Sequence, residues 1–268
     1  MKVSVLILTQ NNENFITNCL KSVSGWAGEI VIIDGGSIDK TLEICRLYKS
    51  KVFHNKWQGF SSQRNFAAKK ATSDWIFYLD ADERMTRSLK KEIDNLRPSK
   101  NIFAFQVKRQ NYILGKFLRK GGWYPDLQTR LINKNELIKW QGKLHEYPKI
   151  KGKMGKLKGS IIHLTHRGIN WCLRKTINYT DLEAALLFQA NHSKVKWWNF
   201  ITAGFREFWQ RGIIKQGLTE GMEGFIAVVY QVFNAFIIYV KLWQLQKKES
   251  MEKIYKKLDS QLLEKEEY

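Results

Sequence analysis

The sequence predicts an α/β protein in which helices sandwich a mostly parallel sheet, with a helical extension at the C-terminal end. Three observations predict this class. Short apolar runs alternate with helical patterns over the first 80 residues, strands in glycine-rich basic surroundings follow after residue 100, and the pattern is helical from about residue 170. Alternating strands and helices of this length are typical of parallel β-α-β units. A chain of 268 residues suits one large domain with an appendage.

The individual elements follow from the spacing of apolar residues. Four apolar runs predict the first strands, at Val3–Leu8, Ile30–Ile33, Val52–Phe53 and Trp75–Leu79. Apolar residues spaced three and four apart predict helices between them, at Phe15–Val23, Leu42–Leu47 and Phe60–Ala71. Ser37 or Asp39 can cap the second of these helices. Antiparallel strands are expected at Phe103–Val107 and Gln128–Ile132.

The domain boundary is expected near residue 168. Residues 1–168 then form the α/β domain, with halves at 1–100 and 101–168, and residues 169–268 form the helical extension. The three cysteines are scattered and show no metal-type spacing. An odd, sparse set of cysteines indicates a reducing compartment rather than a disulfide framework.

The charge of the chain is unevenly distributed. The net charge is +20, and residues 101–180 alone carry 17 basic and 3 acidic residues. Such a field attracts phosphorylated partners, which include nucleic acid, anionic lipid and phosphorylated glycans. A solvated basic surface without a specific partner is the alternative.

The most informative motif is Asp80-Ala81-Asp82, which directly follows the apolar run Trp75–Leu79. A buried strand that ends in two carboxylates delivers negative charge to the carboxyl edge of a sheet, where open α/β folds bind their ligands. Two carboxylates there can hold Mg²⁺ or Mn²⁺, and such an ion usually also takes phosphate oxygens. The alternative is an ordinary acidic turn after a strand.

Other polar residues are expected at the same edge. The first strand ends at Thr9, followed by Asn11 and Glu13, and the second ends at Asp34-Gly35. Carboxylates crowded there repel each other unless a cation or ligand is present. The sequence has no P-loop lysine pattern and no G-x-G-x-x-G, so the motifs do not favour an ATPase or a dinucleotide-binding protein.

These motifs, in this order, resemble the family 2, GT-A type glycosyltransferases. The order is Thr9, then Asp34-Gly-Gly-Ser-x-Asp-x-Thr, Arg64-Asn65 and Asp80-Ala-Asp, and it spans about residues 1–110. The continuation through Trp123-Tyr124-Pro125-Asp126, Arg130 and His145-Glu146 is similar to a branch that extends the lipopolysaccharide inner core by β-1,4-glucosyl transfer. The resemblance implies a GT-A type, Rossmann-like catalytic domain, with a nucleotide-binding half at 1–100 and an acceptor half at 101–168.

The resemblance also implies roles for individual residues. The residues expected to bind the nucleotide-sugar are Thr9, Asn11, Glu13, Asp34, Gly35, Arg64, Asp80 and Ala81. The expected ligands of Mg²⁺ or Mn²⁺ are Asp82, Asp80 and His163, although His163 can equally be a structural histidine. The residues expected to bind the acceptor are Trp123, Tyr124, Arg130 and His145.

The resemblance further implies inverting transfer of a hexose, with glucose from UDP-glucose as the expected donor, to a lipid-linked or phosphorylated glycan. A carboxylate must then take the proton of the acceptor hydroxyl. Glu146 is the preferred candidate, and Asp126, which follows two aromatic residues, is the alternative. Glu83 is a third acid, which can instead cap a helix that starts after Thr86.

The segment Phe225–Val240 is the nearest approach to a membrane segment. Fourteen of its sixteen residues are apolar, which falls short of the roughly 20 needed to span a bilayer. Gln231, Asn234, Lys241 and Gln244 draw one narrow polar stripe on this helix. We expect the C-terminal helices to lie on an anionic membrane, which makes the protein cytoplasmic and peripheral on the inner face of the cell membrane. A helix packed on the main domain or an interface of a homo-oligomer is the alternative.

Two other functions are weighed against glycosyl transfer. A sugar nucleotidyltransferase usually carries a glycine-rich basic loop after the first strand, where this chain has Gln10-Asn11-Asn12-Glu13. A nucleic-acid-binding protein explains the net charge but not the acidic cluster at the sheet edge. We therefore expect no nucleic-acid partner.

Overall fold

The computed structural model describes residues 1–144 and 146–264. The chain divides into two compact units, one over Met1–Thr165 and one that begins at His166. We call these the α/β unit and the helical unit and describe each by itself.

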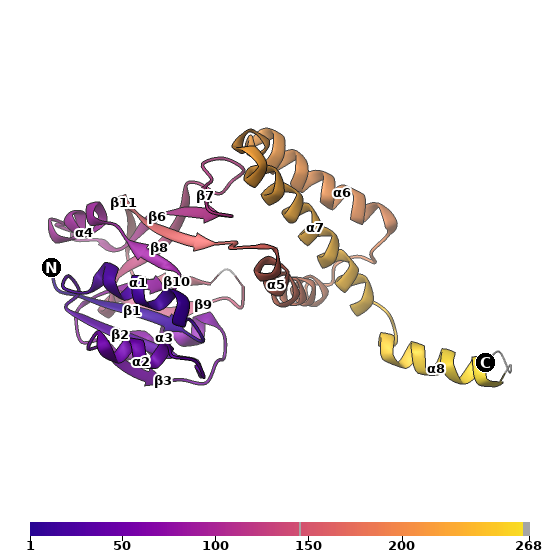
Figure 1. Ribbon diagram of the computed structural model, residues 1–268, viewed down its shortest axis with the longest axis horizontal. Coiled ribbons are helices and arrows are strands. Elements are labelled where there is room, and N and C mark those ends of the chain that lie inside the picture. The colour runs from indigo at the N-terminus through magenta and orange to yellow at the C-terminus, as the bar shows by residue number, and fades with distance from the viewer. Residues whose placement is uncertain (145, 265–268) are drawn as a thin grey trace. The chain divides into compact units, whose positions relative to one another are not determined.

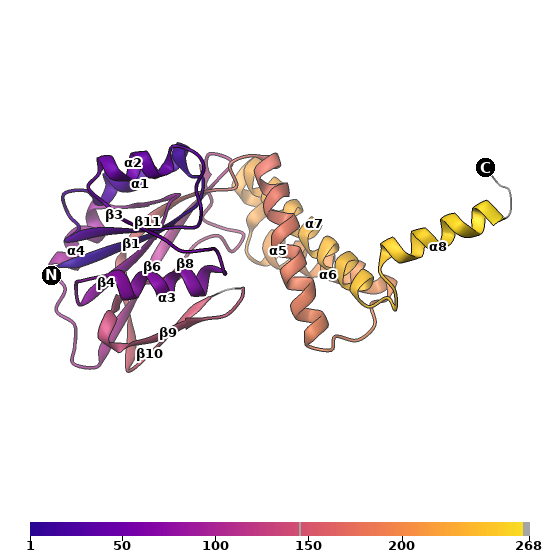
Figure 2. The same ribbon diagram turned by 90° about the horizontal axis from the view of Figure 1, so that it is seen from below.

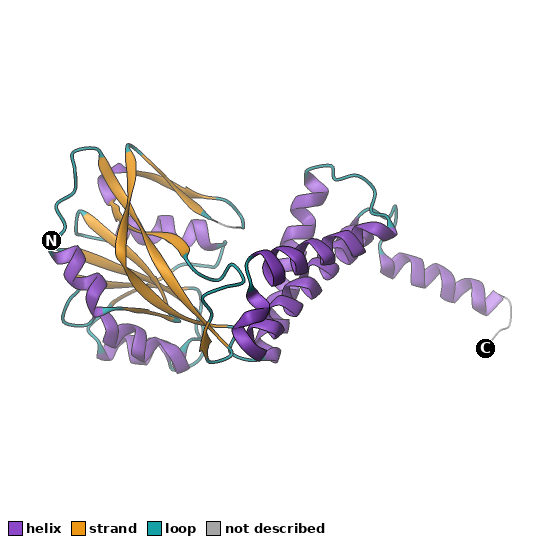
Figure 3. Cartoon of the chain, turned by 90° about the horizontal axis from the view of Figure 1, so that it is seen from above, coloured by secondary structure: helices purple, strands orange, loops and turns teal. Residues whose placement is uncertain are grey.

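The α/β unit is built on one mixed sheet with the strand order β3-β2-β1-β4-β8-β6-β11-β5, and β7 pairs with β6. Figure 3 shows these strands as one twisted sheet. The strands are β1 (Val3–Thr9), β2 (Glu29–Asp34), β3 (Lys51–His54), β4 (Trp75–Asp80), β5 (Glu83–Met85), β6 (Ile102–Ile113), β7 (Lys116–Phe117), β8 (Asp126–Asn133) and β11 (Lys153–Thr165). The first four are parallel to one another, and β8 runs antiparallel to both β4 and β6.

Helices and a hairpin cover the two faces of this sheet. The helices are α1 (Glu13–Val23), α2 (Thr41–Leu47), α3 (Phe60–Lys70) and α4 (Arg87–Asp94), and the short helix η1 (Lys134–Glu136) leads into the hairpin β9 (Leu137–Gln141) and β10 (Tyr147–Ile150). Side chains alternate along β1, so Val5 and Ile7 join a core with α1 and α4, whereas Leu6 and Leu8 join a core with α3 and β9. Figure 2 shows α1 and α2 on one side of the sheet and α3 with the hairpin on the other.

The register of the parallel strands brings their last residues together. Thr9 pairs with Asp34, Asp34 pairs with His54, and Leu8 pairs with Asp80. The predicted gathering of Thr9, Asp34 and Asp80 at one edge of the sheet is therefore confirmed. So is the α/β class with a mostly parallel first half.

Strand β6 is longer than the apolar pattern predicts. The sequence predicts Phe103–Val107, and the structure continues the strand to Ile113. The prediction stopped at Val107 because the next four residues are all polar. These side chains have partners inside the molecule, since Arg109 and Asn111 both bind Asp126, so the strand continues without an apolar pattern.

The helical unit consists of α5 (Ile169–Gln189), α6 (Trp197–Glu207), η2 (Phe208–Ile214), η3 (Gly217–Glu220), α7 (Gly221–Leu245) and α8 (Met251–Glu264). Helices α5 and α6 both pack against α7 (Figure 1). The polar stripe of α7 partly faces α5: the Asn234 side chain accepts a hydrogen bond from Thr176 at 2.7 Å, and Lys241 pairs with Asp181 at 2.7 Å. Within the described residues, Gly217–Leu245 is the one helical stretch whose length and composition would allow it to cross a membrane.

Candidate functional site

Two loops interlock at the edge where β1 and β2 end. Asp34 is fully buried, and its carboxylate accepts hydrogen bonds from the backbone N–H groups of Gly36 and Ser37 and from the Ser37 hydroxyl. His54, at the end of β3, lies 3.0 Å from the same carboxylate. Asp34 therefore fixes the shape of its own loop, and Gly35 lies within that loop.

Asn11 and Glu13, in the loop after β1, bind the backbone of the loop after β2 through their side chains. The Asn11 side chain accepts a hydrogen bond from the backbone of Ile38, and the Glu13 carboxylate accepts one from Lys40. In return, Asp39 accepts hydrogen bonds from the backbone N–H groups of Glu13 and Thr41. Lys40 is the N-cap residue of α2, and Asp39, one residue before it, accepts the hydrogen bond from the N–H of Thr41, the first residue of the helix, so Asp39 serves the expected capping role from the preceding position.

An alternating chain of arginines and carboxylates crosses the middle of the site. Asp80 binds Arg64 through one oxygen at 3.1 Å and Arg130 through the other at 2.8 Å. The contacts continue from Arg64 to Glu146 at 3.2 Å, from Arg130 to Glu83, from Glu83 to Arg109 at 3.5 Å and from Arg109 to Asp126 at 2.7 Å. We call this set the arginine–carboxylate network; its members are Glu146, Arg64, Asp80, Arg130, Glu83, Arg109 and Asp126.

Burial and mutual charge set the protonation of the network. Burial alone would raise the pKa of Asp80, but the guanidinium groups of Arg130 and Arg64 hold it well below the usual value. Burial would likewise lower the pKa of Arg130, and the carboxylates of Asp80 and Glu83 raise it instead. Asp80 is therefore ionised at neutral pH, and both of its oxygens are already engaged by arginines.

Glu83 and Arg130 are buried members of the network. Glu83 is fully buried, and burial raises its pKa. The suggestion that Glu83 caps the following helix is wrong, because Thr86 caps α4 with its own hydroxyl. Arg130 is only 2% exposed, binds Asp80 and Glu83, and lines the pocket described below; its contact with an acceptor stays a prediction.

Asp82 and His163 lie together beyond the end of β4. The His163 Nε2 atom is 3.6 Å from a carboxylate oxygen of Asp82, and the His163 Nδ1 atom is 2.6 Å from the Asn111 side-chain oxygen. Among the described residues, no group of three or more His, Cys, Asp or Glu side chains is placed to hold a metal ion. Asp82 offers a carboxylate oxygen of the kind that usually holds Mg²⁺ together with phosphate oxygens and water, and His163 would add a ring nitrogen.

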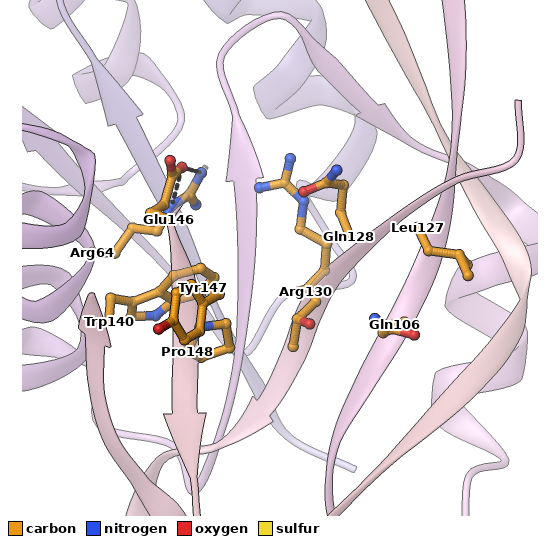
Figure 4. A pocket seen from close by; sticks show the side chains of 10 residues that line it. Arg64, Gln106, Leu127, Gln128, Arg130, Trp140, Glu146, Tyr147 and Pro148 are labelled. Atoms are coloured by element: carbon orange, nitrogen blue, oxygen red, sulfur yellow. Dashed lines mark hydrogen bonds and ion pairs between the residues drawn. The ribbon is translucent and has the colours of Figure 1, made fainter. Parts of the chain in front are cut away.

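A pocket of about 170 Å³ lies beside the network, between the sheet and the β9–β10 hairpin (Figure 4). Its lining comes from α3, β6, β8 and the hairpin, and consists of Arg64, Gln106, Leu127, Gln128, Thr129, Arg130, Trp140, Glu146, Tyr147 and Pro148. The Arg64 guanidinium lies 5.0 Å from the Trp140 ring centre and 5.4 Å from that of Tyr78. Sequence reasoning missed the hairpin and with it Trp140 and Tyr147, because strands of four and five residues with a proline give almost no periodic signal.

The two candidate bases differ in how fully they are bonded. Asp126 accepts hydrogen bonds from Arg109, Asn111 and Gln128. Burial would raise its pKa, but Arg109 and these hydrogen bonds lower it. The Glu146 carboxylate binds Arg64 through Oε1, and within the described residues its Oε2 makes no hydrogen bond. Glu146 therefore brings an oxygen without a hydrogen bond from the described residues to the pocket wall, whereas both Asp126 oxygens accept hydrogen bonds and Asp126 is not among the lining residues given above.

The aromatic residues expected on the acceptor side are near this region. The Tyr124 ring contacts Phe117 with a centroid distance of 5.2 Å, and the Trp123 carbonyl accepts a hydrogen bond from Asn111. His145, also expected to bind the acceptor, lies outside the described residues.

Comparison with known proteins decides the family. Residues 4–169 match Glycosyl transferase family 2. The chain belongs to this family. Its α/β unit is accordingly of the GT-A type. Family membership favours glycosyl transfer over the nucleotidyltransferase and nucleic-acid-binding alternatives.

Several curated family 2 relatives match nearly the whole chain. An uncharacterised glycosyltransferase of Rickettsia typhi is 26% identical and covers 92% of this chain and 88% of its own. The lipopolysaccharide core biosynthesis glycosyltransferase LpsC of Rhizobium meliloti is 25% identical and covers 89% of this chain and 92% of its own. Among solved structures, S. aureus TarS in complex with UDP-GlcNAc matches 93% of each chain with 15% identity and a TM-score of 0.47.

We predict that Arg130→Met lowers the free energy of unfolding by about 3–5 kcal/mol, because it leaves the buried carboxylate of Glu83 and the partly buried carboxylate of Asp80 without their shared partner. The loss should shrink below about pH 4. Asp80 has a depressed pKa, so its ion pairs stabilise the fold above the ordinary aspartate pKa and lose this effect as the pH falls. Urea unfolding of the wild-type protein and of Arg130→Met, repeated at steps of about one pH unit between pH 3 and pH 7, measures this difference in stability.

Arg46→Met is the matched control, because Arg46 is exposed on α2. Its effect should stay within about 0.5 kcal/mol at every pH. Equal stabilities of the two variants would show that the network does not hold this edge together.

Proposed function

We propose that this family 2 enzyme is an inverting, metal-dependent hexosyltransferase. It transfers a hexose, with glucose as the first candidate, from a UDP-sugar to a lipid-linked glycan such as the inner core of a lipopolysaccharide. The observation that carries the proposal is the pairing of Asp82 with His163 at the strand ends, while Arg64 joins the neighbouring Asp80 to Glu146 at the pocket wall.

The ion in this proposal is Mg²⁺ or Mn²⁺, held by Asp82 and His163. When bound, the ion neutralises the charge that develops on the leaving diphosphate. Asp80 remains in the proposed site as the anchor of Arg64 and Arg130 and lies near the ribose. The nucleotide is proposed to lie over the strand ends at Thr9 and Asp34, where the loops at 10–13 and 35–41 form the edge.

Glu146 is the proposed general base. In the reaction, the acceptor oxygen attacks the anomeric carbon as the bond from that carbon to the diphosphate breaks, and the acceptor proton passes to Glu146. Attack from the side opposite the leaving group inverts the anomeric configuration. Within the part of the chain that the structure describes, Oε2 of Glu146 makes no hydrogen bond whereas both oxygens of Asp126 accept them, and this difference supports the assignment.

The charge of residues 101–180, which include the acceptor half, supports a phosphorylated or lipid-linked acceptor. The 14 excess positive charges between residues 101 and 180 attract phosphate groups. LpsC, a relative over most of its length, is named for lipopolysaccharide core biosynthesis. This supports a lipopolysaccharide-type acceptor for the present enzyme.

The helical unit is proposed to bind the inner face of an anionic membrane. Large apolar side chains follow one exposed side of α7: Met222, Phe225, Ile226, Val229, Phe233, Phe236 and Trp243. The opposite side, with Gly224, Val228 and Leu242, is buried in the unit. A soluble helix would expose polar residues here, so the pattern supports a helix that lies in a bilayer surface.

Two substitutions separate the proposed roles of the metal ligand and the general base. Asp82→Asn should abolish the Mn²⁺-dependent part of UDP binding, measured by calorimetry. Glu146→Gln should retain UDP affinity and lower kcat by about 10²–10⁴-fold, the range for a lost general base. Turnover is measured as nucleotide released from a panel of UDP-sugars in the presence of a lipid-linked acceptor.

Glu136→Gln is the control for Glu146→Gln, because Glu136 lies in η1, in the same half of the unit. It should turn over at the wild-type rate. Full activity of Glu146→Gln, together with loss of activity but not of UDP binding in Asp126→Asn, would make Asp126 the base. Unchanged Mn²⁺-dependent binding in Asp82→Asn would contradict the proposed metal site.

For the membrane, we predict that Phe225→Gln with Phe233→Gln reduces flotation with liposomes that contain anionic lipid. Both rings are more than 40% exposed, so the change removes apolar contact with lipid and leaves the packing of the unit largely intact. Ile138→Gln, an equivalent change at an exposed site on β9, is the control. Flotation equal to wild type, together with a change from dimer to monomer in light scattering, would assign the stripe to an interface between two copies.

A further inference from the structure

We propose that Asn111 is a positioning residue that fixes the tautomer of His163 and so turns the free nitrogen of that ring toward the metal site. The inference rests on the proposed function, since it concerns the ion that Asp82 and His163 would hold. It assigns a role to a residue that no sequence motif singles out.

The orientation of the Asn111 amide is determined by its partners. Asn111 is 3% exposed on β6, and its Nδ2 lies 2.8 Å from the Trp123 carbonyl oxygen and 3.0 Å from an Asp126 carboxylate oxygen. A carbonyl and an ionised carboxylate only accept hydrogen bonds, so the amide nitrogen must face them. The amide oxygen of Asn111 therefore faces His163.

This orientation determines which nitrogen of His163 carries the proton. The Asn111 oxygen is 2.6 Å from Nδ1 of His163, and an amide oxygen can only accept. Nδ1 must therefore be the donor. In the neutral ring Nε2 then carries the lone pair, and it lies on the side of Asp82, 3.6 Å from its carboxylate oxygen.

Without Asn111, the neighbouring carboxylate would favour the opposite tautomer. An Nε2–H group could donate toward Asp82, which would leave no lone pair for a cation between the two side chains. A metal-binding histidine generally donates its other ring N–H to an acceptor that fixes its orientation. Asn111 supplies that acceptor here, and the β6–β11 ladder sets the two residues side by side, because His163 is paired with Asn111 in the register.

Asp126 acts on His163 indirectly, through Asn111. It holds the Asn111 amide nitrogen, and Arg109 and Gln128 hold Asp126 in turn. This gives the Asp126 carboxylate, which is bonded through both oxygens, a role in positioning Asn111. The arginine–carboxylate network is thereby connected to the metal site through one amide.

The direct test is the tautomer of His163, read from ¹⁵N chemical shifts of ¹⁵N-histidine-labelled protein at pH 8 without metal. The His163 signals are assigned by their loss in His163→Gln. The proposal expects Nδ1–H in the wild-type protein and a shift toward Nε2–H in Asn111→Ala. A wild-type ring protonated at Nε2 overturns the proposal, and this measurement needs neither a variant fold nor a bound ion.

The second test is Mn²⁺ affinity in the presence of UDP, measured by electron paramagnetic resonance. Asn111→Ala should bind Mn²⁺ about 10–100-fold more weakly, the usual cost of losing a partner of a metal-binding histidine. Gln110→Ala is the control, because Gln110 is the adjacent residue and its amide binds Ser160. It should bind Mn²⁺ with wild-type affinity, and thermal unfolding checks that both variants are folded.

The outcomes separate this inference from the proposed function. If wild type binds Mn²⁺ and a folded Asn111→Ala binds it equally well, the positioning role is wrong and the metal-dependent transferase stands. If the wild-type protein binds no Mn²⁺ with UDP, the proposed metal dependence fails, and the role of Asn111 toward the metal fails with it.

Discussion

The geometry of the sheet edge depends on the ion pairs that Asp80 makes with Arg64 and Arg130. Arg64 comes from α3, Asp80 from the end of β4 and Arg130 from β8, so one carboxylate ties three elements together. Two of these side chains, Arg64 and Arg130, are almost fully buried. A buried charge is tolerated only where opposite charges and hydrogen bonds compensate its lost hydration. Positive and negative side chains alternate along the network, and this alternation supplies the compensation. Glu146, at one end of the network, and Asp82, beside it, are partly exposed, so a ligand can reach them.

The sequence predicts the first half of the fold well because its signals are local. The run Trp75–Leu79 and the acidic residues that follow it predict both a buried strand and its functional end, and the parallel register confirms their place. The network was not predictable in the same way. Arg130 and Asp80 lie 50 residues apart, and Arg64 and Glu146 lie 82 apart. No spacing in the chain reports which charges meet, so the ion pairs of Arg130 could not be predicted from the sequence.

Polar residues inside strands account for most of what sequence reasoning missed. The polar run after Val107 hid the second half of β6, and Asn111 lies within it. The role proposed for Asn111 depends on the register between β6 and β11, which brings Asn111 beside His163. Trp140 was missed for a different reason, since the β9–β10 hairpin that carries it is short and folds over α3 rather than joining the main sheet. Its backbone is held by Asn65, a residue noted only as part of a motif.

The two units have different surfaces, and each suits a different part of the proposed function. The α/β unit concentrates charge at one edge, whereas the helical unit exposes an apolar stripe along a 25-residue helix. A lipid-linked acceptor joins a polar glycan to a membrane, so an enzyme that acts on it needs both kinds of surface.

The central claim concerns the charged edge of the sheet. Anomalous diffraction at the manganese absorption edge, from crystals soaked with Mn²⁺ and UDP, tests this claim most directly. The account predicts a manganese peak bonded to Asp82 and to Nε2 of His163, with the diphosphate beside it. A nucleotide bound at this edge without manganese, or manganese bound elsewhere, would contradict it.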